Sequence, residues 1–364
     1  MKKLGVALLS GGIGSRMREL GITKPKPIIP HGGMCCLTDF SINNSYLSGV
    51  QEVLIMAKFE SKKIINYLQN TWPASDKFRL HYGVFNDVYT KDFDKVFEEV
   101  SPPDEKGTAD AVIKNWGYLG NDKFSDIMIL HSDHVYNFDY NEMLEYHRKS
   151  NAALTIGYKD IELKYVKLFG MTTFDDDNNL IELIEKPANP TSPTIFTAVA
   201  IFNKEKLAKY LSELQKTNWN YDISKDVIPA MIKNKEKIKG FHFKDYWEDI
   251  GTLERYYISN MNFLKPNPEI RFDQLPVTIS KDIKRKHIIK EKTITNSIVA
   301  ENAICDGIIE NSIIYPGAFI AKGSVIKDSI ILPDAQIKGN SKITSSIIFE
   351  NHIIENKEVI DNYK

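Results

Sequence analysis

Residues 310–326 read ENSIIYPGAFIAKGSVI, residues 327–343 read KDSIILPDAQIKGNSKI, and residues 344–360 read TSSIIFENHIIENKEVI. These stretches repeat with a period of 17, and isoleucines recur at spacings of five, six and six from Ile309 to Ile360. A short repeat with one inward apolar residue for each flat face is typical of a parallel β-helix, because every coil stacks on the next. The C-terminal part of the chain is therefore predicted to be a β-helix, with a shorter first coil just before the repeats.

The chain up to residue 264 has a different pattern, in which short apolar runs alternate with amphipathic segments. The apolar runs predict strands at residues 5–9, 52–56, 126–130, 152–158 and 197–202. Apolar residues three and four apart predict helices at residues 37–48, 62–68, 143–150 and 204–214. Alternating strands and helices indicate a mostly parallel α/β sheet, in which ligands bind beyond the carboxyl ends of the strands.

The length and composition agree with this division. A chain of 364 residues, 42% of them hydrophobic, is long enough for about two domains of roughly 150 residues. We expect a catalytic domain over residues 1–264, a linker over 265–290 and a β-helix over 291–364. The formal net charge of −1 provides no overall field for binding nucleic acid or an anionic membrane.

Cysteine usage and hydropathy favour a cytoplasmic protein. The three cysteines, Cys35, Cys36 and Cys305, are odd in number and two are adjacent, which does not suit a disulfide framework. The apolar run over residues 4–9 is too short for a secretory signal, and no run approaches the ~20 residues that cross a bilayer. We therefore expect no membrane partner.

A glycine-rich turn follows the first predicted strand. Gly11, Gly12 and Gly14 lie between that strand and the next helical segment, where backbone N–H groups can approach phosphate oxygens. Arg16 and Lys26 would neutralise a triphosphate there. The turn has neither the GK[ST] of a P-loop nor the GxGxxG spacing of a dinucleotide fold, and a tight turn without a ligand is the alternative interpretation.

Three further polar residues are candidates for ligand binding. Asp133 comes directly after a predicted strand, where a carboxylate is suited to holding Mg²⁺, and Asp249 is the natural second ligand. The alternative is that each carboxylate caps a helix or a turn. Lys186, in the segment IEKP, is either a phosphate ligand or a surface lysine.

Together these motifs resemble the sugar-1-phosphate nucleotidyltransferases, most closely the glucose-1-phosphate adenylyltransferase (ADP-glucose pyrophosphorylase) family. The resemblance covers nearly the whole chain, including the β-helix, which is that family's companion domain. Its segments are LSGGIGSRM at 9–17, KPKPIIPHGG at 24–33, LTDFSINNSYLSGV at 37–50, GTADAV at 107–112, ILHSDHVYNFDYNEMLEYH at 129–147, FGM at 169–171, IEKPANP at 184–190, SKDVIP at 224–229 and YWEDIGTLERYYISNMNFL at 246–264.

The resemblance implies an α/β Rossmann-like nucleotidyltransferase domain with a mixed, mostly parallel sheet, followed by a C-terminal left-handed parallel β-helix. A sugar 1-phosphate oxygen would attack the α-phosphorus of a nucleoside triphosphate and expel pyrophosphate. By similarity, the nucleotide would be bound by Gly11, Gly12, Gly14, Arg16, Lys26, Gly107 and Thr108. The sugar phosphate would be bound by Gly170, Glu185 and Lys186, and Mg²⁺ by Asp133 and Asp249. The resemblance also implies a homo-oligomer, possibly a tetramer.

The chain differs from that family at positions associated with the base and with the sugar pocket. Lys58 stands where family members carry the glutamine of a TQY segment associated with the base. Glu105-Lys106 replaces a Tyr-Arg pair, Phe196-Thr197-Ala198 replaces the SMG segment of the sugar pocket, and Glu248 replaces a basic residue beside Asp249.

Several functions remain open. The first is synthesis of ADP-glucose from ATP and glucose 1-phosphate, as in glycogen biosynthesis. The second is the same chemistry with another base or sugar, such as GTP, CTP or UTP with mannose 1-phosphate, which Lys58, Glu105 and Phe196 favour. A regulatory subunit without turnover is less consistent with the retained Arg16 and Lys26, and acyl transfer is least consistent because the repeats hold a single histidine.

Overall fold

The computed structural model describes residues 3–12, 14–17, 19–102 and 104–361. The described residues form two compact units, each built from segments that are far apart in the sequence. The sheet unit comprises the described residues of Met1–Gly12, Ser41–Ser132 and Phe138–Trp247. The β-helix unit comprises those of Ile13–Phe40, Asp133–Asn137 and Glu248–Lys364. The predicted domain boundaries follow the sequence order instead and stay predictions.

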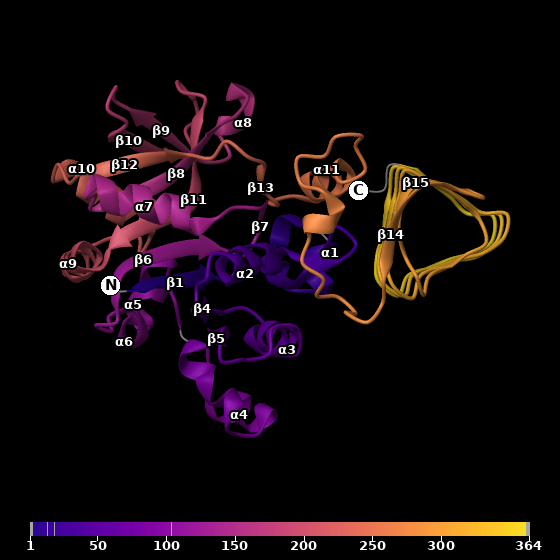
Figure 1. Cartoon of the computed structure of the whole chain (residues 1–364), viewed down its shortest axis with the longest axis horizontal. Helices are drawn as coiled ribbons and strands as arrows, with labels where there is room; N and C mark the ends of the chain where they lie inside the picture. The colour runs from indigo at the N-terminus through magenta and orange to yellow at the C-terminus, as the bar shows by residue number, and fades with distance from the viewer. Residues whose placement is uncertain (1–2, 13, 18, 103, 362–364) are drawn as a thin grey trace. The chain divides into compact units, whose positions relative to one another are not determined.

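The sheet unit is organised around one large sheet, which Figure 1 shows with helices packed on it. Within the described residues this sheet has nine strands, in the order β10-β9-β11-β6-β1-β4-β5, with β8 beside β11 and β12 beside β8. The strands are β1 (Lys3–Leu9), β4 (Glu52–Met56), β5 (Arg79–His81), β6 (Phe124–His131), β8 (Leu154–Asp160), β9 (Gly170–Phe174), β10 (Leu180–Glu185), β11 (Thr194–Asn203) and β12 (Ile238–His242).

The sheet is mixed and mostly parallel, as predicted. β1 pairs in parallel with both β4 and β6, while β11 is antiparallel to β6, β8 and β9. Among the described strands, β10 and β11 therefore run against the others. The central strands are continuous apolar runs because both faces of the sheet are covered, and Val6, Ala7 and Leu8 have no exposed surface.

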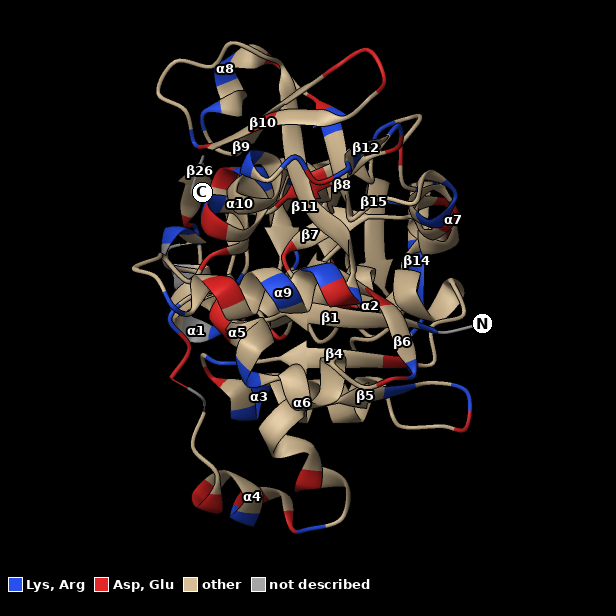
Figure 2. Cartoon of the chain, turned by 90° about the vertical axis from the view of Figure 1, so that its left-hand side faces the viewer, with Lys and Arg blue, Asp and Glu red and all other residues tan. Residues whose placement is uncertain are grey.

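Helices cover this sheet and connect its strands. Their bounds are α2 (Leu37–Leu47), α3 (Ser61–Thr71), α4 (Phe93–Glu99), α5 (Thr108–Lys114), α6 (Trp116–Leu119), α7 (Tyr140–Ser150), α8 (Leu163–Val166), α9 (Lys204–Leu214), α10 (Ile228–Lys233), the 3₁₀ helix η3 (Gly83–Tyr89) and the π-helix η4 (Ile223–Val227). α2 begins in the β-helix unit and ends in the sheet unit. Figure 2 shows basic and acidic residues interspersed along α9, as expected for a solvated helix face.

The β-helix unit ends in coils of short parallel strands, which Figure 1 shows nearly end-on as a stacked triangle. β14 is antiparallel to β15, and the strands from β15 onward stack in parallel, coil upon coil. The strands are β14 (Arg285–Glu291), β15 (Ile294–Ala300), β16 (Ile304–Cys305), β17 (Ile308–Glu310), β18 (Ile313–Ile314), β19 (Phe319–Ile320), β20 (Val325–Lys327), β21 (Ile330–Ile331), β22 (Gln336–Ile337), β23 (Lys342–Thr344), β24 (Ile347–Ile348), β25 (Ile353–Ile354) and β26 (Val359–Asp361).

The predicted period of 17 residues is the stacking period of the coils. Ile320 pairs with Ile337, and Ile337 pairs with Ile354, so each isoleucine lies over the equivalent residue of the next coil. All three are buried in one core cluster. The first coil is shorter, as predicted, because Ile298 pairs with Ile313 only 15 residues later.

The β-helix unit also contains shorter elements, some of which contact the coils. They are the 3₁₀ helices η1 (Ser15–Met17), η2 (Lys26–Ile28) and η5 (Phe272–Gln274), the helices α1 (Glu19–Thr23) and α11 (Leu253–Asn262), and the strands β2 (Pro30–His31), β3 (Cys35–Cys36), β7 (His134–Tyr136) and β13 (Trp247–Asp249), the first residue of which belongs to the sheet unit. A Cβ built at Gly33 would lie 3.1 Å from Ile298 and 3.3 Å from Ile313. One outer isoleucine face of the β-helix is therefore covered by the chain itself.

The predicted strands and helices are confirmed, with shifts at their ends. The predicted strand 52–56 matches β4 and the predicted helix 204–214 matches α9, whereas β11 extends beyond its predicted run at both ends. β14 begins inside the stretch expected to be a linker. No helix in the described part of the chain has both the length and the hydropathy to cross a bilayer.

Candidate active site

The glycine turn directly follows β1, as predicted. Gly14 has φ +71°, a left-handed conformation that residues with a side chain rarely adopt, and a Cβ there would lie 3.2 Å from Cβ of Lys26. The N–H of Met17 donates to the carbonyl of Gly14 at 2.8 Å and begins a helical turn. The backbone therefore requires glycine at this position and brings it against Lys26.

Lys26 lies in η2 and is buried, with 7% of its surface exposed. Its Nζ lies 2.5 Å from Oδ2 of Asp133 and 3.7 Å from Oδ1 of Asp249. Burial alone would lower the pKa of Lys26, but the charges of Asp133 and Asp249 outweigh it and raise the pKa. Lys26 is thus held as a cation between two carboxylates, all within the β-helix unit.

Backbone pairing places the two aspartates side by side. The N–H of Ile250 donates to the carbonyl of Asp133 at 3.0 Å, and strands β7 and β13 pair next to this contact. A Cβ at Gly251 would lie 3.5 Å from both Nη2 of Arg16 and Oδ2 of Asp249. The structure therefore brings together Arg16, Lys26, Asp133 and Asp249, which sequence reasoning had selected from three distant segments.

This cluster has the donor chemistry of a divalent cation site. Two aspartate carboxylates, each about three-quarters buried, already share one cationic partner, the ammonium of Lys26. Carboxylate oxygens are the protein ligands that Mg²⁺ prefers. The residues present therefore fit a magnesium ion beside Lys26.

Glu248 reverses a charge of the resembled family beside Asp249, and the structure offsets it. Nε of Arg255 donates to Oε1 of Glu248 at 2.7 Å. Arg255 lies in α11, the helix that follows strand β13, and β13 carries Glu248. The local charge near Asp249 is therefore less negative than the sequence suggests.

In the sheet unit, Lys58 lies beside the glycine turn. A Cβ at Gly11 would lie 3.5 Å from Cβ of Lys58. The ammonium of Lys58 donates to the backbone carbonyl of Glu105, two residues before Gly107. Lys58 thus links the segment after β4 to the segment that begins α5.

Gly107 and Thr108 are held by two residues that sequence reasoning missed, Tyr221 and Asp222. A Cβ at Gly107 would lie 2.3 Å from the carbonyl oxygen of Tyr221, so this close approach requires glycine. Oγ1 of Thr108 donates to Oδ2 of Asp222 at 3.2 Å and accepts from the N–H of Ile223 at 2.9 Å. The signal in the sequence was the neighbouring SKDVIP segment, which begins two residues after Asp222.

The predicted sugar-phosphate residues meet where β9 and β10 pair. Gly170 pairs with Glu185, and a Cβ at Gly170 would lie 3.2 Å from Oε2 of Glu185 and 3.7 Å from Cβ of Phe196. Lys186 has φ +50° and its N–H donates to the carbonyl of Phe169 at 2.9 Å. Its Nζ lies 3.5 Å from Glu185, and its side chain is 57% exposed and accessible to a ligand.

Two family models match the chain. Residues 6–265 match the model described as nucleotidyl transferase, and residues 281–362 match the GlmU-like C-terminal hexapeptide model. The first match spans more than half of the chain and contains the predicted site residues.

Curated relatives match most of the chain. It is 39% identical over 327 residues to valienol-1-phosphate guanylyltransferase of Streptomyces hygroscopicus subsp. limoneus, covering 88% of each chain. It is 30% identical over 338 residues to glucose-1-phosphate adenylyltransferase of Geobacillus stearothermophilus, covering 89% of this chain and 84% of the relative. The corresponding enzyme of Fusobacterium nucleatum subsp. nucleatum is 31% identical over 329 residues, with coverage of 89% and 84%. With these matches and a cationic, carboxylate-lined cluster beside a glycine turn, the chain belongs to the nucleotidyl transferase family, as a sugar-1-phosphate nucleotidyltransferase.

Proposed function

We propose that this enzyme transfers a guanylyl group from GTP to the 1-phosphate of a sugar or of a ring analogue such as valienol, with release of pyrophosphate. The observation that carries the proposal is the position of Lys58 beside Gly11, at the start of the proposed nucleotide site. The higher identity to a guanylyltransferase than to the adenylyltransferases supports it.

Lys58 favours guanine for a chemical reason. An ammonium group has three hydrogen-bond donors and no acceptor. Guanine presents two acceptors, O6 and N7, on the edge where adenine presents N7 and a donating amino group. A lysine that reaches the base would therefore stabilise bound GTP. In ATP it would face the amino group of adenine, which is also a hydrogen-bond donor.

Phe196 supports an acceptor other than glucose 1-phosphate. Its Cβ lies 3.7 Å from the Cβ position of Gly170, in the group that includes Glu185. The ring of Phe196 is buried in the core of the sheet unit, where the resembled family has its SMG segment. This difference beside Glu185, the carboxylate proposed to accept ring hydroxyls, favours an acceptor ring other than glucose.

The chain's residues would divide the chemistry between charge neutralisation and positioning. An oxygen of the acceptor phosphate attacks the α-phosphorus of GTP, the bond from that phosphorus to the β-phosphate oxygen breaks, and pyrophosphate leaves. Lys26 and Arg16 would offset the charge that grows on the triphosphate, and Lys186 would hold the acceptor phosphate. Asp133 and Asp249 would hold Mg²⁺, which when bound supplies further positive charge at the phosphates.

The second candidate is adenylyl transfer from ATP to glucose 1-phosphate, as in ADP-glucose synthesis. Identities of 30% and 31% to such enzymes favour it, over a similar share of the chain. The two candidates share every proposed catalytic residue and differ at the base and the sugar ring.

A substrate matrix separates them. Pyrophosphate release by the purified chain with Mg²⁺ is measured for ATP, GTP, CTP and UTP against glucose, mannose and valienol 1-phosphates. We expect the highest kcat/KM for GTP. A preference for ATP with glucose 1-phosphate would overturn the proposal in favour of the second candidate, and no release with any pair would favour a regulatory subunit.

A further inference from the structure

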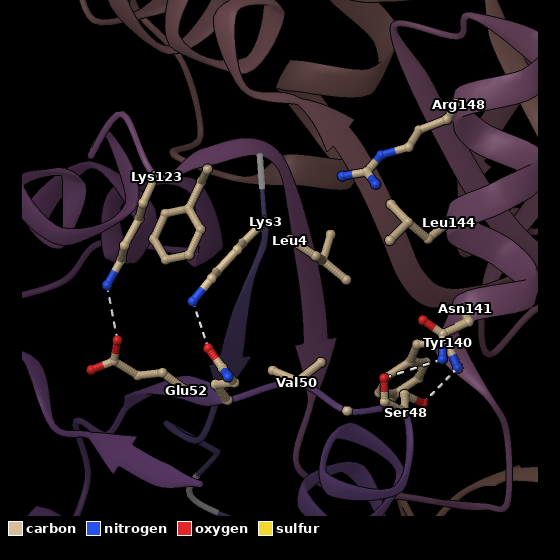
Figure 3. A pocket seen from close by; sticks show the side chains of 13 residues that line it. Lys3, Leu4, Ser48, Val50, Glu52, Lys123, Tyr140, Asn141, Leu144 and Arg148 are labelled. Carbon is tan, nitrogen blue, oxygen red and sulfur yellow. Dashed lines mark hydrogen bonds and ion pairs between the residues drawn. The ribbon is translucent and has the colours of Figure 1, made fainter. Parts of the chain in front are cut away.

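A cavity of about 360 Å³ lies in the sheet unit, at the amino ends of its central strands (Figure 3). Its wall comes from the first residues of β1 and β6, the loop between α2 and β4, and one face of α7. The lining residues are Lys3, Leu4, Ser48, Gly49, Val50, Gln51, Glu52, Lys123, Phe124, Tyr140, Asn141, Leu144 and Arg148. The volume is within the range of roughly 300–1,000 Å³ that is typical of small-molecule sites.

The cavity is separate from the proposed nucleotide site. Lys3 is the first residue of β1 and lines the cavity, whereas Gly11 follows the last residue of that strand. A strand of seven residues spans roughly 20 Å. A ligand in the cavity would therefore bind at the opposite edge of the sheet from the glycine turn.

Positive charge exceeds negative charge around this cavity. Lys123 lies 2.9 Å from Glu52, which also binds Arg79 at 2.8 Å, and Arg148 lies 2.8 Å from Asp126. Each of these carboxylates is thus bound by one of the lining cations, and Glu52 by an additional arginine.

Lys3 adds a further cation to the wall. Its ammonium donates to the neutral amide oxygen of Gln51 at 2.5 Å, so this contact leaves its charge uncompensated (Figure 3). Among the described lining residues and their ion-pair partners, four cations therefore face two carboxylates. The excess charge suits an anion.

The middle of the wall is apolar. Leu4, Val50 and Leu144 point into the cavity between the charged groups (Figure 3). The ammonium of Lys123 also lies 4.8 Å from the ring centre of Phe124, which is itself buried. A wholly hydrophilic anion would leave this surface without a partner, whereas an aromatic body would cover it.

We propose that this cavity binds a small aromatic carboxylate, with its ring against Leu4, Val50 and Leu144 and its carboxylate at Lys3. The site is independent of the substrates of nucleotidyl transfer, and the proposal does not depend on which base or sugar the enzyme uses.

The test compares 2-naphthoate with 2-naphthamide, which has the same ring system and no charge, by titration calorimetry on the full chain. We expect the acid to bind about tenfold more tightly than the amide, equivalent to one charge-assisted contact. Inorganic pyrophosphate with Mg²⁺, a ligand of the reaction site for any base, should leave the affinity for naphthoate unchanged.

Three variants assign the binding to the cavity. Lys3→Gln should remove the preference for the acid, and Leu144→Glu should abolish naphthoate binding by adding a like charge to the wall. Lys216→Gln, an exposed lysine on the chain segment after α9, is the matched control and should bind as the unmodified chain does. Thermal melting checks that each variant is folded.

Four results would contradict binding of an aromatic carboxylate in this cavity. Absence of naphthoate binding, equal affinity for acid and amide, an unchanged preference in Lys3→Gln, or competition by pyrophosphate would each overturn the proposal. None of these results bears on pyrophosphate release from GTP, so failure of this proposal is distinct from failure of the proposed function.

Discussion

The ammonium of Lys26 lies 2.5 Å from a carboxylate oxygen of Asp133, although 107 residues separate them in the sequence. The lysine is buried, while the aspartate keeps about a quarter of its side chain exposed. A buried cation fixes the position of this carboxylate, whose other oxygen, Oδ1, lies 3.6 Å from Nε2 of His134. This ion pair therefore orients Asp133 for the metal role proposed above.

Asp133→Asn should reduce Mg²⁺-dependent turnover by about a hundredfold or more, because a neutral amide is a poor ligand for a hard cation. Thermal melting should show that the fold is intact. The assay is pyrophosphate release across a Mg²⁺ titration, with the exposed Asp245→Asn as a matched control. A near-normal rate would remove Asp133 from the metal site.

Lys58→Gln should shift the base preference. We expect kcat/KM for GTP relative to ATP to fall about tenfold, because the amide can donate to one base and accept from the other. The exposed Lys77→Gln controls for the loss of one positive charge. An unchanged ratio in Lys58→Gln would show that this lysine does not contact the base.

Lys186→Ala should raise KM for the sugar 1-phosphate and leave KM for the nucleotide unchanged. The side chain is exposed and lies next to Glu185, so its loss removes one positive charge without opening a cavity. Initial rates with each substrate varied in turn measure both constants. Lys167→Ala, also exposed, is the control, and an effect confined to the nucleotide KM would contradict the assignment.

Glu52 should make the free energy of unfolding depend on pH in the acid range. Burial alone would raise the pKa of Glu52, but hydrogen bonds from Lys123 and Arg79 outweigh it and lower the pKa from 4.5 to about 2. The unfolded chain then binds the proton more readily than the folded chain. The stabilisation is complete above about pH 4.5 and is lost as the pH falls toward 2.

Glu52→Gln should therefore flatten this part of the pH profile. We expect the free energy of unfolding near neutral pH to fall, and its slope between pH 4.5 and 2 to decrease. Urea unfolding at a series of pH values measures both. Glu205→Gln, an exposed change in α9, should leave the slope as it is.

Ile337→Ala should destabilise the β-helix. Ile337 has no exposed surface and lies between Ile320 and Ile354 of the adjacent coils. The cavity should cost about 2–5 kcal/mol in denaturant unfolding. Ile353, the neighbour of Ile354, is 50% exposed, and Ile353→Ala should cost much less. Equal costs would contradict the inward and outward assignment.

Periodicity determined much of the fold because it is a local property of the chain. The 17-residue repeat predicted which isoleucines stack, and the register from Ile320 through Ile337 to Ile354 confirms it. Long apolar runs likewise predicted β1, β4 and β6. β9 and β10 were missed because they are short and half-polar, with buried and exposed residues mixed along β10.

For the candidate site, too, the sequence predicted one part and left another part open. Residue chemistry, motif order and the family resemblance together selected Arg16, Lys26, Asp133 and Asp249, and the structure brings these four together. Their roles in catalysis, the magnesium ion and the homo-oligomer stay predictions.

The sequence by itself predicted the fold class, the coil register and a set of candidate site residues, because spacing and residue type are properties of neighbouring positions. Only the tertiary structure decided that Asp222 holds Thr108, that Lys58 lies beside Gly11, and that Lys3 and Leu144 line one cavity. Each of these contacts joins distant segments through the pairing of strands and the packing of helices on them. No local pattern encodes such a contact, because its partners become neighbours only when the sheet has formed.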